Sequence, residues 1–157
     1  MEPTSRKYLF FDLDGTLTDS MPGIARAVQY ALRRFGIDVQ DLAALKPFLG
    51  PPLRDSFMEF YGMSPEEADR AVAVSREYFV PRGMFENELY PGIPELLAAT
   101  AAAGRVNVIA TSKPQPFAER IAAHFGIDRH FRLISGSTFD GRRKTKADVI
   151  RHALSAL

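Results

Sequence analysis

The chain has 157 residues, 46% of them hydrophobic, with 20 basic against 19 acidic side chains and no cysteine. This composition supports one domain, or one core with a small insertion, and excludes a disordered chain, a disulfide-stabilised fold and a thiolate metal site. The formal charge of +1 gives no general affinity for nucleic acid, and no apolar run approaches the roughly 20 residues that cross a bilayer, so we expect neither nucleic acid nor a membrane as a partner.

The chain begins with a polar stretch, residues 1–7, followed by a short apolar run, Tyr8 to Phe11. We expect that the polar start is not a signal peptide, and with the lack of cysteine it is compatible with a reducing cytoplasm, the location that we expect. The apolar run is typical of a strand buried on both faces. It ends in Asp12 and Asp14, and the binding pocket of an open parallel sheet lies beyond the carboxyl ends of its strands.

The spacing of these two carboxylates indicates phosphoryl chemistry. Side chains at i and i+2 of an extended segment point the same way, so Asp12 and Asp14 can face one pocket. Clustered carboxylates repel unless a cation lies between them, and Mg²⁺ suits an oxygen site shared with a substrate phosphate. Asp12 can then attack phosphorus as a nucleophile, while Asp14 protonates the leaving oxygen and later deprotonates water.

Gly15 and Thr16 follow directly. Glycine permits a tight turn whose backbone N–H groups, including that of Thr16, can face phosphoryl oxygens. The plainer alternative is a strand end followed by an ordinary Asp-Gly turn, and the residue pattern favours the catalytic interpretation.

From about residue 20 to 86 the pattern is helical, with no strand. Apolar residues recur at helical spacing over 22–35 and 53–61, with a shorter helix expected over 41–48. A further helix begins at Ser64 with a capping box and extends to about residue 79. An all-helical insert directly after a catalytic strand predicts a cap domain.

Alternation of strands and helices resumes after the insert. We expect strands over 106–110 and 131–134 and helices over 94–103 and around 117–125. A polar loop from Ser135 to Lys146 precedes a final helix. Its apolar stripe consists of Val149, Ile150, Ala153, Leu154 and Leu157.

Thr111 directly follows the second core strand, so in a parallel sheet it reaches the same edge as Asp12. Its hydroxyl can donate to a phosphoryl oxygen, or Thr111 and Ser112 can cap the following helix. Four cations lie between residues 142 and 146, either as a solvated basic loop or as a source of charge for the phosphate.

Asp12-Leu13-Asp14-Gly15-Thr16 resembles the first motif of the haloacid dehalogenase-like hydrolase superfamily, and the second Asp resembles its phosphatase and phosphomutase branches. The stretch 108–113 resembles the second motif, which implies that Thr111 is catalytic and that Ser112 and Lys113 lie at the phosphate. The resemblance covers essentially the whole chain.

The third family motif is a lysine near a helix start. The position of Lys146 resembles that of the motif lysine in the phosphoglycolate-phosphatase-like branch more closely. The position of Lys144 fits a form of the motif that is used elsewhere in the superfamily. The segment 50–54 resembles the cap segment that faces the active site in this branch, which implies that Arg54 meets an anionic substrate; a surface arginine is the alternative.

The fourth motif, a Gly-Asp pair that supplies further metal carboxylates, is absent. We therefore expect an α/β fold, a Rossmann-like parallel core with an inserted helical cap, whose C-terminal part is missing by truncation of a longer phosphatase. The core would comprise 1–19 and 87–157, and the cap 20–86.

The resemblance implies a Mg²⁺-dependent phosphomonoester hydrolase with Asp12 and Asp14 at the metal. Its partner would be a small phosphorylated metabolite: a phosphoglycolate-like compound, a nucleotide or a sugar phosphate. The alternatives are a β-phosphoglucomutase-like phosphomutase and a catalytically weak or dead fragment. The sequence leaves the oligomeric state open.

Overall fold

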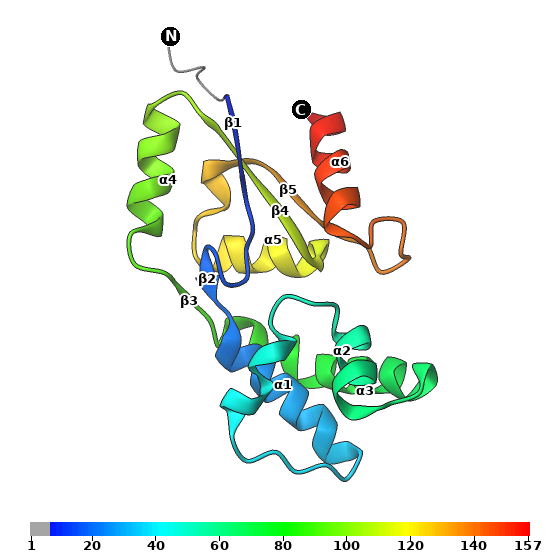
Figure 1. The fold of residues 1–157 in the computed structure, drawn as a ribbon. Coiled ribbons are helices and arrows are strands. Elements are labelled where there is room, and N and C mark those ends of the chain that lie inside the picture. The colour runs from blue at the N-terminus through cyan, green and yellow to red at the C-terminus, as the bar shows by residue number, and fades with distance from the viewer. Residues whose placement is uncertain (1–6) are drawn as a thin grey trace. The chain divides into compact units, whose positions relative to one another are not determined.

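A computed structural model describes residues 7–157 of the chain (Figure 1). The described chain forms two compact units. One contains the residues up to Leu17 together with Leu89–Leu157, and the other contains Thr18–Glu88. None of the helices in the described part is both long and apolar enough to cross a membrane.

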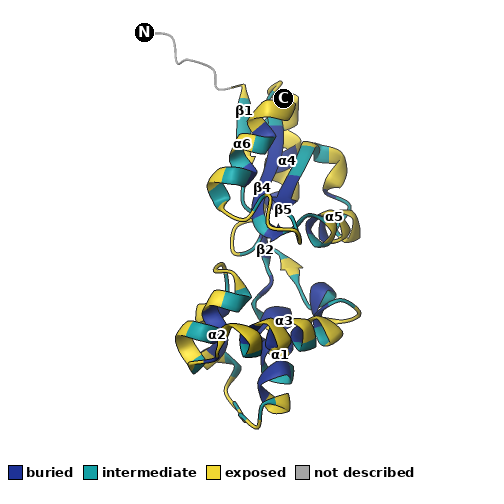
Figure 2. Ribbon diagram, turned by 90° about the vertical axis from the view of Figure 1, so that its right-hand side faces the viewer, coloured by how far each residue is buried: buried dark blue, intermediate teal, exposed yellow. Residues whose placement is uncertain are grey.

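The first unit is a parallel α/β layer. Its sheet has the order β1-β4-β5, and both pairs of neighbouring strands are parallel. Helix α6 lies on one face of this sheet, and α4 and α5 lie on the other (Figure 2). The elements are β1 (Tyr8–Phe11), α4 (Ile93–Ala102), β4 (Val106–Pro114), α5 (Gln115–His124), the 3₁₀ turn η3 (Asp128–His130), β5 (Phe131–Ser137) and α6 (Lys146–Ala156).

The core of this unit follows from the apolar composition of its central strand. Val108 and Ile109 in β4 are fully buried because helices cover both faces of the sheet. The register places Phe11 of β1 opposite Ile109, so the two strands run toward the same edge. The three core strands expected from the sequence are therefore confirmed, and they form one parallel sheet.

Strand β4 is longer and less regular than expected. It continues to Pro114 instead of ending at Ala110, and its pairing with β5 shifts between these two residues. Three residues of β4 face one residue of β5, Gly136, across this stretch. Such bulges re-aim side chains and are common beside active sites.

Gly136 makes the bulge possible. A Cβ atom there would lie 2.7 Å from the Lys113 carbonyl oxygen and 2.7 Å from the backbone nitrogen of Gln115. Real Cβ atoms do not approach backbone atoms so closely, so only glycine fits at this position of β5, where the strand passes the start of α5.

The second unit is built from helices. Its capping box at Ser64 and Glu67, expected from the sequence, is confirmed. Glycines at positions 23 and 83 let α1 and η2 approach, since a Cβ on Gly23 would lie 1.8 Å from the Gly83 carbonyl oxygen. Its helical elements are α1 (Met21–Arg34), the 3₁₀ helix η1 (Leu42–Phe48), α2 (Leu53–Tyr61), α3 (Pro65–Phe79) and the 3₁₀ turn η2 (Gly83–Phe85).

Two short strands, β2 (Thr18–Asp19) and β3 (Glu88–Leu89), form a separate two-stranded sheet. The helix expected over 41–48 is a 3₁₀ helix, and Pro47 inside it cannot donate the hydrogen bond that a longer α-helix needs. The apolar stripe expected on the last helix is only partly covered: Val149 and Ala153 are buried, whereas Leu154 is 58% exposed.

Candidate active site

Asp12 stands directly after β1 and pairs with the first residue of α6. Lys146 Nζ lies 2.7 Å from Asp12 Oδ2 and donates a hydrogen bond of 3.0 Å to the Ala110 carbonyl oxygen of β4. Both charged side chains of the pair are about 40% exposed, so a ligand can reach them. The structure thus brings together Asp12, the predicted nucleophile, and Lys146, the lysine that the resemblance favoured.

The start of α6 is held rigidly, and this fixes the direction of Lys146. Thr145 Oγ1 accepts a hydrogen bond from the backbone N–H of Asp148, and Asp148 Oδ2 accepts one from the backbone N–H of Thr145. This capping box supplies partners for backbone N–H groups that a helix start otherwise leaves unsatisfied. Hydrogen bonds from Thr145 lower the pKa of Asp148 to about 2.

The alternative lysine, Lys144, lies before the capping box and contributes a backbone hydrogen bond of 3.3 Å to Asp148. Lys146, two residues later, is the one whose ammonium reaches Asp12. The geometry therefore favours Lys146 over Lys144, as the resemblance did.

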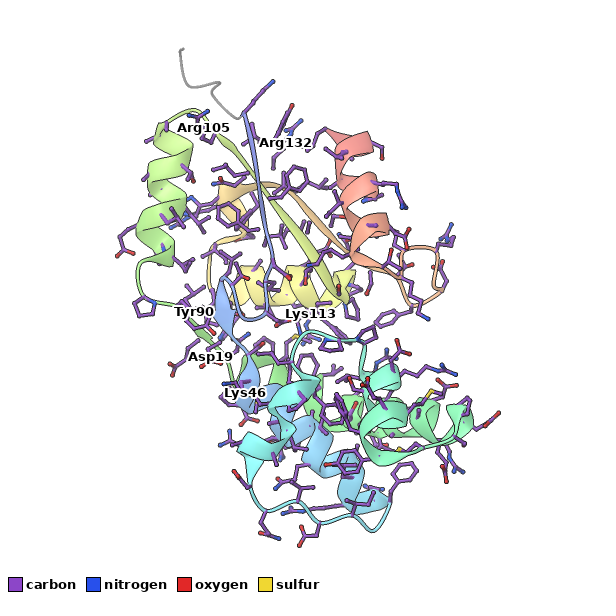
Figure 3. The ribbon with its side chains drawn as sticks, in the orientation of Figure 1. Asp19, Lys46, Tyr90, Arg105, Lys113 and Arg132 are labelled. Atoms are coloured by element: carbon purple, nitrogen blue, oxygen red, sulfur yellow. The ribbon has the colours of Figure 1, made fainter. Side chains whose placement is uncertain are left out.

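Asp14 pairs with a lysine from the bulge of β4. Lys113 Nζ lies 3.1 Å from Asp14 Oδ2, and the exposed fractions of the two side chains are only 6% and 14%. Lys113 comes from the carboxyl-terminal part of β4, at the opposite end of the sheet from Arg105 and Arg132 (Figure 3). The resemblance implied that Lys113 lies at the phosphate, and in the structure its ammonium group forms an ion pair with Asp14.

The segment after Asp12 forms a tight turn. The Leu13 carbonyl oxygen accepts hydrogen bonds from the backbone N–H groups of Thr16, at 3.3 Å, and Leu17, at 2.9 Å. Gly15 has a φ of 74°, a left-handed conformation that glycine adopts without strain. Gly15 and Thr16 are both exposed, and they lie between the two carboxylates and the end of the turn.

Thr111 lies inside β4 and not after it, which corrects the expectation that the strand ends at Ala110. Its side chain is almost fully buried, and its Oγ1 accepts a hydrogen bond from the backbone N–H of Lys113. The alternative that Thr111 and Ser112 cap the next helix is wrong, because Pro114 occupies the N-cap of α5. Ser112 is half-buried in the bulge.

Arg54 belongs to the second compact unit. Its Nε donates a hydrogen bond of 2.7 Å to Asp69 Oδ1, and its side chain is 41% exposed. Within that unit it is thus a partly exposed arginine with a carboxylate partner, and a role in binding substrate stays a prediction.

The residues present fit a hard divalent cation in one respect. Asp14 Oδ1 is buried and lacks a hydrogen-bond partner within the described part of the chain. Two carboxylates one residue apart, one with a free oxygen, suit Mg²⁺ shared with a phosphate. Residues 7–157 contain no group of three or more carboxylate, histidine or cysteine side chains placed to hold a metal.

Two contributors to this site went unrecognised in the sequence. The Ala110 carbonyl oxygen accepts a hydrogen bond from Lys146, and Gly136 makes room for the bulge that carries Lys113. A carbonyl group has no sequence signal at all. The only available signal for Gly136 was an isolated glycine within a strand pattern, which indicates a close backbone approach.

The chain is similar to proteins of known families over most of its length. The model of the haloacid dehalogenase-like hydrolase family matches residues 9–157. Among solved structures, a predicted phosphatase from Clostridium acetobutylicum has a TM-score of 0.93 and 48% identity, and the match covers 96% of this chain and 70% of that one.

Two curated relatives show the range of the similarity. Over 148 residues the chain is 51% identical to a 5′-nucleotidase from Pseudomonas aeruginosa, covering 94% of this chain and 67% of that protein. Over 153 residues it is 40% identical to the tyrosine-protein kinase PtkA from Mycobacterium tuberculosis, covering 98% and 52% respectively. The chain thus spans between about half and two thirds of the length of these relatives.

Proposed function

The chain belongs to the haloacid dehalogenase-like hydrolase family, and from this premise we propose that it hydrolyses phosphomonoesters through a phosphoryl group carried by Asp12. The family and the parallel α/β core expected from the sequence are confirmed. One observation carries the proposal: each carboxylate of the Asp12-x-Asp14 pair has a lysine ammonium within 3.1 Å, at the carboxyl edge of one sheet.

In the first half of the proposed reaction an oxygen of Asp12 attacks phosphorus, and the bond from phosphorus to the ester oxygen breaks. Asp14 passes a proton from its partner Lys113, 3.1 Å away, to the departing alcohol, and Asp12 is left as an aspartyl phosphate. Lys146, at 2.7 Å from Asp12 Oδ2, lies where its positive charge offsets negative charge that builds up on the phosphoryl oxygens.

In the second half, water attacks the aspartyl phosphate and Asp14 accepts its proton. Inorganic phosphate departs and the Asp12 carboxylate is restored. The buried hydroxyl of Thr111, the exposed turn at Gly15 and Thr16, and the half-buried Ser112 are the groups that we propose bind the phosphoryl oxygens.

We propose that Asp12 and Asp14 hold Mg²⁺, because the buried oxygen of Asp14 otherwise lacks a partner in the described chain. When bound there, Mg²⁺ supplies positive charge to the phosphate oxygens and orients the ester. The substrate would be a small phosphorylated metabolite, and the name of the 5′-nucleotidase relative makes nucleoside 5′-monophosphates the first class to test.

A second candidate is transfer of the phosphoryl group from Asp12 to a hydroxyl other than that of water, as in a phosphomutase. The name of the relative PtkA, a tyrosine-protein kinase, favours keeping this candidate. The two are separated by stoichiometry. Hydrolysis releases one inorganic phosphate for each ester consumed, whereas transfer releases less and yields a new phosphate ester.

The test is turnover of p-nitrophenyl phosphate with Mg²⁺ by the wild type and by Asp12→Asn. We expect the variant to lose at least roughly a thousandfold in kcat/KM, since its amide cannot form the acyl phosphate. Asp38→Asn is the matched control, because that carboxylate is 63% exposed in the other unit. Beryllofluoride, a phosphoryl mimic, should attach to the wild type only, and activity persisting in Asp12→Asn would overturn the mechanism.

A further inference from the structure

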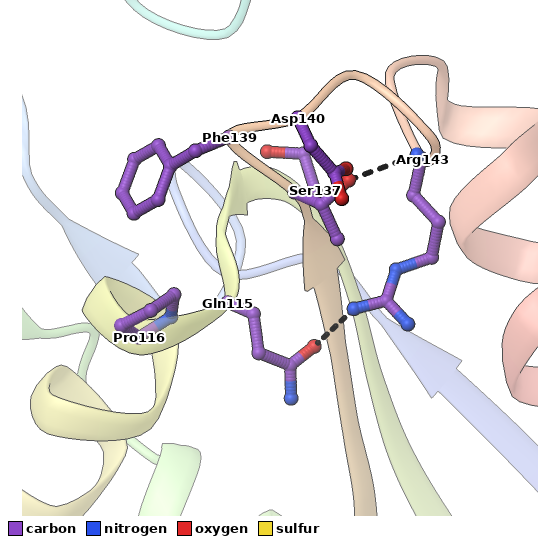
Figure 4. Close-up of a pocket in the computed structure, with 7 residues that line it drawn as sticks. Gln115, Pro116, Ser137, Phe139, Asp140 and Arg143 are labelled. Atoms are coloured by element: carbon purple, nitrogen blue, oxygen red, sulfur yellow. Dashed lines mark hydrogen bonds between the residues drawn. The ribbon is translucent and has the colours of Figure 1, made fainter.

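A pocket of about 380 Å³ lies at the carboxyl edge of the sheet, between the start of α5 and the loop that connects β5 to α6. Its volume falls in the range of small-molecule sites, roughly 300–1,000 Å³. Phe139 and Pro116 lie on one side of it, and the guanidinium group of Arg143 lies on the other (Figure 4). No motif in the sequence pointed to this pocket.

The guanidinium group of Arg143 is held in a fixed plane. Its Nε donates a hydrogen bond of 3.1 Å to the Gly136 carbonyl oxygen, and its Nη2 donates one of 3.3 Å to Gln115 Oε1. The same oxygen of Gln115 accepts a bond of 2.8 Å from the backbone N–H of Gly136. Because these bonds lie along the edge of the guanidinium group, its flat face is left for stacking.

The opposite wall is aromatic. Phe139 is 58% exposed although it is a large apolar side chain, and it packs edge-on against Phe117 with ring centres 5.6 Å apart. The loop that carries it is closed by two hydrogen bonds of 3.0 Å between Thr138 and Arg143. The pocket therefore pairs an exposed ring with a flat cation on a braced loop.

The residues of both walls are only a few positions along the chain from residues of the candidate active site. Gln115 follows Lys113 by two residues, and Arg143 precedes Lys146 by three, so each wall begins within about 7–11 Å along the backbone from a lysine that touches a catalytic carboxylate. Pro114 and Ser137, which end β4 and β5, are register partners at this edge.

The two walls of the pocket suit a planar aromatic ligand. Asp140 also lines the pocket, and hydrogen bonds from Thr138 and Arg142 lower its pKa to about 2, so it is ionised at neutral pH. The Asp140 carboxylate is paired with Arg142 at 2.6 Å, and an aromatic base can stack on a ring and on a guanidinium face at little electrostatic cost.

We propose that this pocket, between Phe139 and Arg143, binds the nucleobase of a nucleoside 5′-monophosphate whose phosphate lies at Asp12. The inference rests on the proposed phosphatase function and names the part of the substrate that the catalytic residues do not contact. Adenosine 5′-monophosphate and ribose 5-phosphate share the sugar and the phosphate and differ in the base, so they are the matched pair of substrates.

The first experiment measures kcat/KM for both esters on the wild type, Phe139→Ala and Leu154→Ala. Leu154 is the control because it has the same exposed fraction, 58%, and lies on the last helix. We expect the wild type to prefer the nucleotide by roughly tenfold, the size of one aromatic stack. Phe139→Ala should abolish that preference without changing turnover of ribose 5-phosphate, and Leu154→Ala should retain it.

A second experiment does not depend on turnover. Saturation-transfer NMR with adenosine should show contact with the wild type, and the signal should fall in Phe139→Ala and in Arg143→Lys, which keeps the charge but loses the plane. Equal kcat/KM for the two esters in the wild type, or an adenosine signal undiminished in Phe139→Ala, would overturn the subsite. If the wild type hydrolyses p-nitrophenyl phosphate but neither of these esters, the nucleotide substrate and with it this subsite are overturned. If it hydrolyses none of the three, the phosphatase function is overturned, while the adenosine signal still decides the pocket.

Discussion

Replacing Lys146 by methionine directly tests the role of the positive charge beside Asp12, the proposed nucleophile. Methionine keeps the length of the side chain and removes the ammonium group that lies 2.7 Å from Asp12 Oδ2 and 3.0 Å from the Ala110 carbonyl oxygen. Lys144→Met is the matched control, because the interaction of Lys144 with Asp148 uses its backbone N–H and survives the substitution.

The structure predicts different sizes for the effects on stability and on catalysis. The ion pair is about 40% exposed on both sides, so solvent screens it and its contribution to folding is at most about 1 kcal/mol. For a chain of this length that corresponds to a Tm lower by about 2–4 °C. A fixed positive charge at the transferring phosphoryl group is worth roughly a hundred- to a thousandfold in rate.

We therefore expect Lys146→Met to lose about two to three orders of magnitude in kcat/KM, with its thermal unfolding nearly unchanged. Lys144→Met should keep wild-type activity. The assay is turnover of p-nitrophenyl phosphate with Mg²⁺, accompanied by thermal denaturation followed by circular dichroism. Near wild-type activity in Lys146→Met, or an equal loss in Lys144→Met, would refute the assignment of this lysine.

Three further outcomes follow from the same structure. Chelation of divalent cations with EDTA should abolish turnover, and added Mg²⁺ should restore it; activity that persists in EDTA contradicts the metal requirement. Gly136→Ala should lower the free energy of unfolding in urea by about 1–3 kcal/mol, because its Cβ would lie 2.7 Å from the backbone of Gln115; an unchanged midpoint would show that the bulge yields. Because the pKa of Asp148 is lowered to about 2 from its ordinary 3.8, its bonds with Thr145 stabilise the fold above pH 4 and are lost as the pH falls toward 2. The difference in Tm between the wild type and Asp148→Ala should therefore be largest near neutral pH and disappear near pH 2.

Local patterns in the sequence were sufficient to predict the main helices and strands of this protein. A short apolar run that ends in Asp12-x-Asp14-Gly15 predicted a strand, two carboxylates and a tight turn, and the structure shows β1 followed by a turn with Gly15 at a φ of 74°. The expectation that this strand is buried on both faces is wrong, because β1 lies at the edge of the described sheet and Phe10 is 37% exposed. The capping box at Ser64 and the helical block between the strands were readable in the same way. These features depend on residues within a few positions of each other, which is why periodicity and capping rules describe them.

The arrangement of the cations required the tertiary structure. Residues 142–146 carry four positive charges, and only the start of α6 at Lys146 decides which ammonium reaches Asp12. Lys113 turns to Asp14 because β4 bulges against β5, and that bulge exists because Gly136, a residue distant in the sequence, has no Cβ. Pairing between strands is a contact at long range, so the local residue pattern of 106–114 predicts a strand but neither its end nor the aim of its side chains. The pocket between Phe139 and Arg143 depends in the same way on a loop folded against α5, for which no local pattern exists.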